Sequence, residues 1–200
     1  MPEPAAHTAK VALITGAARR IGAAIARRLH ADGYAIALHF HRSQTDAQAL
    51  AAELERARPG SVLLLQADLA DFDRLPEMIA NTIGRFGRLD ALVNNASAFF
   101  PTAVGVTTPA QWETLFAANV RAPFFLAQAA APHLRANGGA IVNLTDIYAQ
   151  QPRGDLAVYA ASKGALESLT RGLAVALAPE VRVNAVAPGA ILWPDADQDP

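Results

Sequence analysis

Six short apolar runs alternate with stretches of helical pattern along almost the whole chain. Strands that alternate with helices are joined by right-handed crossovers, which build a parallel sheet with helices on both faces. The sequence therefore predicts an α/β protein with a Rossmann-like, doubly wound parallel β-sheet. The expected strands span residues 10–15, 34–40, 62–67, 89–93, 140–145 and 181–186. After a turn at 16–22, the first expected helix runs to about residue 31, and the other helical stretches span 45–58, 72–86, 108–135 (with a break near 119–123) and 157–178.

The composition fits such a sheet and one domain. Hydrophobic residues make up 52% of the 200 residues and charged residues only 18%, as expected where strands are buried on both faces. A chain of this length forms one domain of ordinary size. We expect a flexible N-terminal tail at residues 1–9 and a single dinucleotide-binding and catalytic domain at residues 10–200.

Charge and cysteine content exclude several classes of function. The net charge is -1 without a basic or acidic block, so nothing indicates nucleic acid or a membrane surface as a partner. The chain has no cysteine, which excludes disulfides and thiolate metal sites and is compatible with a reducing compartment. We see neither a signal peptide nor an apolar run long enough to cross a bilayer. We therefore expect a soluble cytoplasmic protein without a metal.

Polar residues and glycines follow the predicted strands. In doubly wound sheets, ligands bind at the edge that is formed by the carboxyl ends of the strands. We therefore expect one site at that edge of the sheet. The segments that would build it are residues 16–22, 41–43, 68, 94–97, 146 and 188–189.

The turn after the first strand is suited to a dinucleotide phosphate. Gly16 permits a tight turn, Gly22 permits close packing of helix on strand, and the free N–H groups at the helix start can bind pyrophosphate. The full G-x-G-x-x-G pattern is absent, and Arg20 between the two glycines would add a cation. An ordinary strand–helix turn with a surface arginine is the alternative.

The end of the second strand distinguishes NAD from NADP. An acidic residue there would bind the ribose hydroxyls of NAD, whereas basic residues accommodate the 2′-phosphate of NADP. This chain carries His41, Arg42 and Ser43 at that place. The sequence therefore favours NADPH, and a solvated polar turn is the alternative.

Tyr159 and Lys163 lie four residues apart at the start of the last long helix, so they share one face of it. An ammonium group beside a phenol favours the phenolate and lowers the pKa of the tyrosine, which makes an acid–base pair. For an isolated Y-x-x-x-K pattern, a surface contact would be the simpler interpretation. The polar segments that follow the other strands favour catalysis.

Over almost its whole length the chain resembles the short-chain dehydrogenase/reductase family. The motifs are TG-x3-R-x-G at residues 15–22, Asp68, NNAS at 94–97, Asn119, YAASK at 159–163 and PG at 188–189. The resemblance implies a nicotinamide-dependent oxidoreductase in which Tyr159 donates a proton, Lys163 holds the nicotinamide ribose, and Asn119 supports a water relay. The implied cofactor contacts are Gly16, Arg20, Ile21, Gly22, His41, Arg42, Ser43, Asp68, Leu69, Asn95, Ala96, Ser97, Tyr159, Lys163, Pro188 and Gly189.

Two residues depart from the general family pattern. Arg20 stands where most members have glycine, and Asp146 stands where most have a serine ahead of the tyrosine. A serine there donates to a carbonyl oxygen, whereas a charged aspartate repels a developing oxyanion. Asp146 therefore suits a substrate that takes its proton on nitrogen, as in the reduction of a C=N bond. A helix cap or a loop position for Asp146 is the alternative.

Both departures are shared by the pteridine reductases, a branch that the chain resembles through GAARRIG, HFHRS, QADL, NNASAFFP and TD…Y…K. The resemblance implies that Arg20 contacts cofactor phosphate and pterin, Ser97 hydrogen-bonds the pterin, and Phe99 stacks on it. For one of Phe99 and Phe100 we expect simple core packing. The implied substrate is a pterin or dihydrofolate, and the implied substrate-binding residues are Arg20, Ser97, Phe99, Asp146 and Tyr159.

Family members continue beyond the sixth strand with a covering segment, a helix and an edge strand. The resemblance therefore implies that this chain lacks its C-terminal edge strand, and that it forms homotetramers only where that C-terminus is present. Two other functions stay open. Reduction of a carbonyl compound of the ketone or 3-oxoacyl type is one, and Asp146 and Phe99 count against it. A catalytically silent nucleotide-binding fragment is the other, favoured only by the missing C-terminus.

Overall fold

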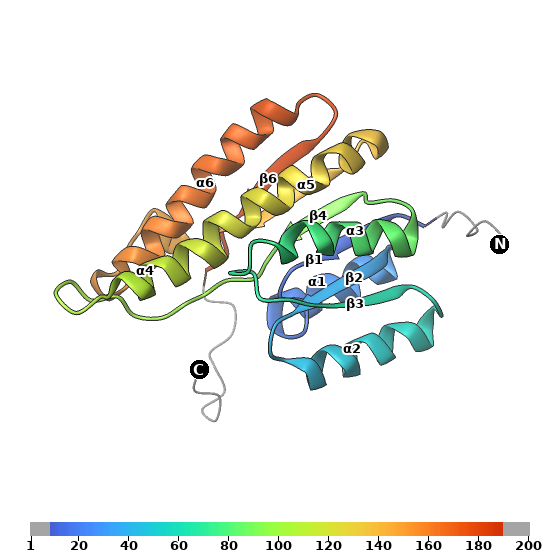
Figure 1. Cartoon of the computed structure of the whole chain (residues 1–200), viewed down its shortest axis with the longest axis horizontal. Coiled ribbons are helices and arrows are strands. Elements are labelled where there is room, and N and C mark those ends of the chain that lie inside the picture. Colours follow the sequence, from blue (N-terminus) through green and yellow to red (C-terminus); the bar gives the residue numbers. More distant parts are fainter. Residues whose placement is uncertain (1–8, 190–200) are drawn as a thin grey trace.

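The computed structural model describes residues 9–189, in which six parallel strands form one sheet with helices on both faces (Figure 1). The predicted Rossmann-like class is confirmed. The strands are β1 (Val11–Ile14), β2 (Ala35–Phe40), β3 (Val62–Gln66), β4 (Ala91–Asn94), β5 (Ala140–Leu144) and β6 (Arg182–Val186). The helices are α1 (Arg20–Ala31), α2 (Gln44–Ala57), α3 (Arg74–Phe86), α4 (Pro109–Phe116), α5 (Ala122–Asn137) and α6 (Ala157–Leu177), with short 3₁₀ turns η2 (Ile147–Ala149) and η3 (Gly154–Leu156).

The sheet separates two apolar cores. Successive side chains of a strand point to opposite faces. In β1, Val11 and Leu13 therefore pack with α3 and α5, whereas Ala12 and Ile14 pack with α1 and α2. All four side chains are fully buried. This two-sided burial explains why the central strands read as continuous apolar runs in the sequence.

The strand order places a topological switch at the centre of the sheet. The order is β3-β2-β1-β4-β5-β6, so the chain builds outward from β1 in one direction and from β4 in the other. A crevice forms outside the carboxyl ends of the strands where the direction reverses. The turn after β1 and the segment after β4 border that crevice, and both belong to the predicted site.

Helix ends follow the capping rules that their sequences suggest. Gly33 and Gly87 end α1 and α3 with φ of 94° and 76°, a left-handed conformation that glycine adopts without a steric penalty. Thr108 and Gln111 exchange hydrogen bonds in a capping box at the start of α4, as their spacing predicts. These three helix boundaries are therefore fixed by local chemistry.

The expected break near residues 119–123 takes a different form. The chain stays helical there, because a π-helix (η1, Ala117–Arg121) joins α4 to α5. A π turn inserts extra backbone without ending the helix. Pro123 then falls at the start of α5, where its missing N–H costs little. Asn119 lies inside the π-helix with its side chain buried.

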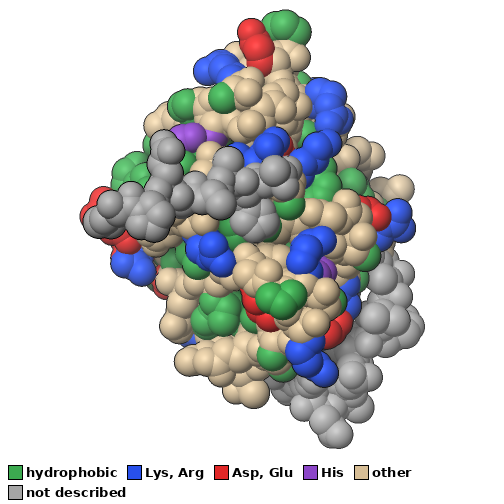
Figure 2. Space-filling model, turned by 90° about the vertical axis from the view of Figure 1, so that its right-hand side faces the viewer, with side chains coloured by type: hydrophobic (Ala, Val, Ile, Leu, Met, Phe, Trp, Pro, Cys, Tyr) green, Lys and Arg blue, Asp and Glu red, His purple; other side chains and the backbone are tan. Residues whose placement is uncertain are grey.

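Two expectations concern segments that are not described. The flexible tail expected at residues 1–9 lies, except for Ala9, outside the described residues, and so does the C-terminal covering segment, which falls on residues 190–200. Between residues 9 and 189, none of the helices is long and apolar enough to cross a membrane. The face of the molecule in Figure 2 carries Lys and Arg side chains interspersed with Asp and Glu rather than gathered into one patch.

Candidate active site

The centre of the site is a hydrogen bond between Tyr159 and Asp146. Tyr159 lies in the first turn of α6, and Asp146 follows the end of β5. The phenol of Tyr159 donates to Oδ2 of Asp146 over 2.7 Å. The other carboxylate oxygen, Oδ1, accepts from the backbone N–H of Tyr148 over 2.9 Å. Asp146 thus caps the short η2 turn and also holds the phenol of Tyr159, whereas its part in proton delivery stays a prediction.

The environment of Tyr159 keeps its proton in place. Burial, the hydrogen bond to Asp146 and the negative charge of that carboxylate raise the pKa of Tyr159 well above its usual value. The expectation that Lys163 lowers this pKa is therefore wrong for the protein as it stands. The carboxylate is in direct contact with the phenol, whereas Nζ of Lys163 lies 5.8 Å from the ring centroid. The phenol therefore carries its proton at neutral pH, as a proton donor must, although it is a weaker acid than a free tyrosine.

Lys163 is a buried cation held by the backbone. Its side chain is only 2% exposed, and Nζ donates to the carbonyl oxygen of Leu144 at the end of β5 over 2.9 Å. Burial lowers the pKa of Lys163 to about 8, although the charge of Asp146 acts in the opposite direction. The ammonium group therefore exchanges protons close to neutral pH.

Asn119 ties the segment after β4 to α6. Its Oδ1 accepts from the hydroxyl of Ser97 and from the N–H of Ala98, at 3.1 and 2.9 Å. Its Nδ2 donates to the carbonyl of Ala98 and to the hydroxyl of Ser162, both at 3.0 Å. These four bonds use the hydrogen-bonding capacity of the amide. They do not include Lys163, so the water relay through Asn119 stays a prediction.

Two phenylalanines after β4 differ in the way the sequence predicts. The ring of Phe99 is 54% exposed and meets Tyr159 edge to face, with the centroids 4.8 Å apart. Phe100 instead packs against the buried cluster of Leu115, Leu156 and Tyr159. Phe99 therefore lies half-exposed beside Tyr159. An aromatic face in this position can stack on a flat heteroaromatic ring.

The turn after β1 has the close backbone packing that a dinucleotide phosphate requires. Gly16 has a φ of 61°, and a Cβ there would lie 2.9 Å from Cα of Ala96. A Cβ on Gly22 would collide with the carbonyl oxygen of Gly16. No side chain caps the start of α1, so its first N–H groups are available to an anion. These observations fit a nucleotide phosphate.

Arg20 occupies a backbone conformation that favours glycine. Its φ is 50°, the only positive φ among the non-glycine residues between 9 and 189. An arginine in this region carries strain of about 1 kcal/mol or more. The chain therefore keeps the backbone shape of a glycine turn while placing an exposed cation at the start of α1.

Hydrogen bonds join this turn to the segment after β4. The hydroxyl of Thr15 accepts from the N–H groups of Asn95 and Ala96, each over 3.0 Å. The amide of Asn95 donates back to the carbonyls of Thr15 and Gly16, at 2.8 and 3.0 Å. The two segments that border the crevice are therefore held together by hydrogen bonds.

The remaining predicted cofactor residues lie at the same edge of the sheet. His41 and Arg42 are exposed after β2, and Ser43 begins α2 without using its hydroxyl as a cap. Nε2 of His41 lies 3.7 Å from Oδ2 of Asp68, which follows β3. Leu69 next to Asp68 is buried. No acidic residue directly follows β2, so the end of this strand is suited to a phosphate.

The segment after β6 packs against η2. The carbonyl of Pro188 accepts from the N–H of Ile147 over 3.3 Å. Gly189 lies beside the same isoleucine, whose side chain would be 3.7 Å from a Cβ at that glycine. Residues 188–189 therefore contact the residue that follows Asp146, and their role in cofactor binding stays a prediction. Ile21 lies in the first turn of α1, is partly buried and packs against the apolar core on the α1 and α2 side of the sheet.

Sequence reasoning missed His39. This histidine is 1% exposed in β2 and contacts the turn after β1 through both its ring and its backbone. The available signal was a histidine within an otherwise apolar strand, two residues before His41.

Between residues 9 and 189 no group of three metal-ligating side chains comes together.

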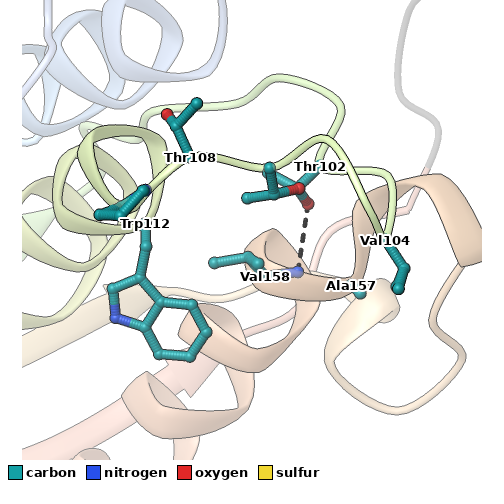
Figure 3. Close-up of a pocket in the computed structure, with 8 residues that line it drawn as sticks. Thr102, Val104, Thr108, Trp112, Ala157 and Val158 are labelled. Carbon is teal, nitrogen blue, oxygen red and sulfur yellow. Dashed lines mark hydrogen bonds between the residues drawn. The ribbon is translucent and has the colours of Figure 1, made fainter.

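A pocket of about 350 Å³ lies apart from these residues (Figure 3). Figure 3 shows Trp112 of α4 beside Val158 of α6, and the hydroxyl of Thr102 accepts from the N–H of Val158. The lining is mostly apolar, and none of the residues predicted for catalysis or cofactor binding lines it. The pocket therefore does not define the chemistry of the site.

Comparison with known proteins identifies relatives of two substrate classes. The family model described as short chain dehydrogenase matches residues 10–199. Pteridine reductase 1 of Leishmania tarentolae is 38% identical over 94% of this chain and 78% of its own length. A putative ketoacyl reductase of granaticin polyketide synthase from Streptomyces violaceoruber is also 38% identical, over 94% and 76%. A 3-oxoacyl-[acyl-carrier-protein] reductase of Staphylococcus aureus is 36% identical, over 92% and 75%.

Proposed function

This chain belongs to the short-chain dehydrogenase family and is an oxidoreductase, and we propose that it is an NADPH-dependent pteridine reductase. The proposed substrate is a pterin or dihydrofolate, whose C=N bond is reduced to a single bond. One observation carries the proposal. The carboxylate of Asp146 accepts a hydrogen bond from Tyr159 over 2.7 Å, at the position where most of the family uses serine.

The carboxylate favours a nitrogen atom over a carbonyl oxygen as the proton acceptor. Reduction of a ketone develops negative charge on oxygen, which a neighbouring carboxylate repels. A C=N nitrogen is more basic than a carbonyl oxygen, so it takes the proton of Tyr159 more readily and carries less negative charge beside the carboxylate. Asp146 orients the phenol for this transfer, and Lys163, whose pKa is about 8, can exchange a proton in support of it.

The groups at the carboxyl ends of β1 and β2 fit NADPH. The uncapped start of α1 and the side chain of Arg20 would hold the pyrophosphate, and His41, Arg42 and Ser43 would hold the 2′-phosphate. When bound, NADPH supplies a hydride to the carbon of the C=N bond and becomes NADP⁺. Phe99 would stack on the pterin ring, and Ser97, held by Asn119, would hydrogen-bond it.

A paired assay tests the proposal. NADPH oxidation is followed at 340 nm with dihydrobiopterin and, separately, with a panel of ketones and a 3-oxoacyl thioester. The wild-type protein is compared with Asp146→Ser, and with Asp32→Ser as a control at the far end of α1. We expect pterin-dependent turnover that falls by about two orders of magnitude or more in Asp146→Ser and is unchanged in the control.

A carbonyl reductase is the second candidate, since relatives named as ketoacyl reductases match at similar identity. Ketone or thioester turnover by the wild type that persists or improves in Asp146→Ser would support this function and contradict pterin reduction. Fold alone does not decide between them, because both classes of relative share it.

A further inference from the structure

We propose that His39 is a positioning residue, which holds the turn after β1 in its cofactor-binding shape through an uncharged imidazole ring. The inference rests on the proposed use of this turn for NADPH. It assigns a role to a side chain that lies beneath the site and touches neither the expected cofactor nor the expected substrate.

The ring connects two of the segments that build the cofactor site. Nδ1 of His39 lies 3.1 Å from the backbone N–H nitrogen of Gly16. Nε2 lies 3.1 Å from the carbonyl oxygen of Ala67, the residue before Asp68. The backbone carbonyl of His39 accepts from the N–H of Ala17 over 2.8 Å. A third segment, His41 to Ser43, begins two residues further along the same strand.

These partners require a single protonation state. The N–H of Gly16 can only donate, so Nδ1 must accept; the carbonyl of Ala67 can only accept, so Nε2 must carry the proton. A second proton, on Nδ1, would place the ring N–H against the backbone N–H of Gly16, and the hydrogen bond between them would be lost. The uncharged tautomer is therefore the one that fits the turn.

The surroundings favour that uncharged state. Burial lowers the pKa of His39 to about 4. The charged or titratable groups that act on it are His41 on its own strand, which lowers the pKa, and Asp68 at the end of β3, which raises it; the hydrogen bond to Ala67 also raises it. At neutral pH the ring is therefore uncharged and able to accept from Gly16.

If His39 only filled space in the core, an apolar side chain of similar size could replace it. Leucine at position 39 would fill a similar volume and keep the backbone bond to Ala17. It would leave the N–H of Gly16 and the carbonyl of Ala67 without their buried partner. Gly16 already has the left-handed φ and the close contact with Ala96 that the turn requires, so a lost bond there loosens the turn itself.

Three substitutions separate these contributions. Asn at position 39 keeps an acceptor near the place of Nδ1, Gln keeps a donor near the place of Nε2, and Leu keeps neither. A matched control is His30→Asn, since His30 is also buried and bonds Ser61 over 2.8 Å, but it lies on α1 away from the turn. Amide hydrogen exchange of residues 15–22 is measured without cofactor, and the Kd for NADPH is measured by fluorescence at pH 7.

We expect faster exchange in the turn and about tenfold weaker NADPH binding in His39→Leu and His39→Gln. His39→Asn should stay near wild type in both, and so should His30→Asn, although it loses stability. Equal exchange in the turn across all four variants would overturn the inference.

The wild-type protein provides a test that needs no variant to fold. The ¹⁵N shifts of His39 at pH 7 should show an unprotonated Nδ1 and a protonated Nε2; the opposite tautomer, or a charged ring, would overturn the inference. Should the wild type bind no NADPH, the proposed function fails, while the exchange and tautomer measurements still decide the role of His39.

Discussion

At the scale of single residues, the site carries groups that work against the stability of the fold. Lys163 is buried with a charge, and the largely buried Tyr159 donates to a carboxylate that is itself partly buried. A buried cation without a carboxylate partner costs folding free energy. Buried groups with shifted pKa values are candidates for a functional site.

Lys163→Met should therefore separate stability from activity. The pKa of Lys163 is about 8 in the folded protein and about 10.5 when unfolded, so the unfolded state binds more protons between these values and stability rises with pH across this window. Below pH 8 the buried charge costs up to about 3 kcal/mol, offset by about 1 kcal/mol for the bond to Leu144.

Thermal unfolding at pH 7 and pH 10 measures this effect. We expect the Lys163→Met protein to be more stable than wild type at pH 7, to lose the rise in stability between pH 8 and 10.5, and to lose at least 100-fold in turnover. A lower melting temperature at pH 7 would contradict the account of Lys163.

Phe99 and Phe100 form a natural matched pair. Phe99 is 54% exposed, so Phe99→Ala should change the melting temperature little while raising the KM for the pterin about tenfold, because stacking is lost. Phe100 packs in the cluster under Tyr159, so Phe100→Ala should lower the melting temperature. Steady-state kinetics and scanning calorimetry measure the two effects. An unchanged KM for the pterin in Phe99→Ala, with a raised KM in Phe100→Ala, would contradict the stacking role of Phe99.

At the scale of elements, the turn between β1 and α1 combines strain with charge. Arg20 has a φ of 50°, so glycine there should relieve about 1 kcal/mol of strain but remove a cation from the phosphate site. Arg20→Gly should therefore unfold at a higher temperature and bind NADPH more weakly. Arg20→Lys keeps both the charge and the strain. Its unfolding temperature and its affinity for NADPH should therefore change less than those of Arg20→Gly.

Titration with NADPH and thermal unfolding of these two variants test whether Arg20 binds the cofactor phosphate. Weaker binding in Arg20→Gly at undiminished stability would support the phosphate role. If Arg20→Gly binds NADPH as tightly as the wild type, the arginine has no part in cofactor binding.

Much of this architecture could be predicted from the chain because its signals are local. Strand positions, the glycine caps at Gly33 and Gly87, and the Thr108 capping box follow from residue chemistry within a few positions. The π-helix could not be predicted in this way. Asn119 and Pro123 suggest a break in the helix, whereas in the structure Asn119 lies in the π-helix and Pro123 in the first turn of α5. Strand boundaries also shift by one or two residues, because the ladder partner rather than propensity ends a strand.

The position of the site could be predicted from the sequence, but its electrostatics could not. The spacing of Tyr159 and Lys163 predicts that they share a face of α6. It does not reveal that Lys163 reaches the carbonyl of Leu144 or that Asp146 lies against the phenol. These tertiary contacts reverse the expected direction of the tyrosine pKa. The roles proposed for the cofactor-binding residues stay predictions.

At the scale of the whole molecule, one edge of the sheet gathers the chemistry. Hydrogen bonds join the turn after β1 directly to the segment after β4 and, through the ring of His39, to the segment after β3. Another hydrogen bond joins the residue after Asp146 to the segment after β6. Relatives named as a pteridine reductase and as a ketoacyl reductase match this chain at the same identity of 38%. We therefore propose that a few side chains at this edge, with Asp146 foremost among them, decide the substrate.

Transfer of deuterium from NADPH labelled at C4 tests the central claim most directly. The wild-type protein is incubated with the labelled cofactor, a dihydropterin and a 3-oxoacyl thioester together, and the products are analysed by mass spectrometry. We predict a tetrahydropterin that carries one deuterium on carbon, with the thioester unchanged. A deuterated hydroxyacyl thioester beside unreacted dihydropterin would contradict the pteridine reductase proposal and assign the site to carbonyl reduction.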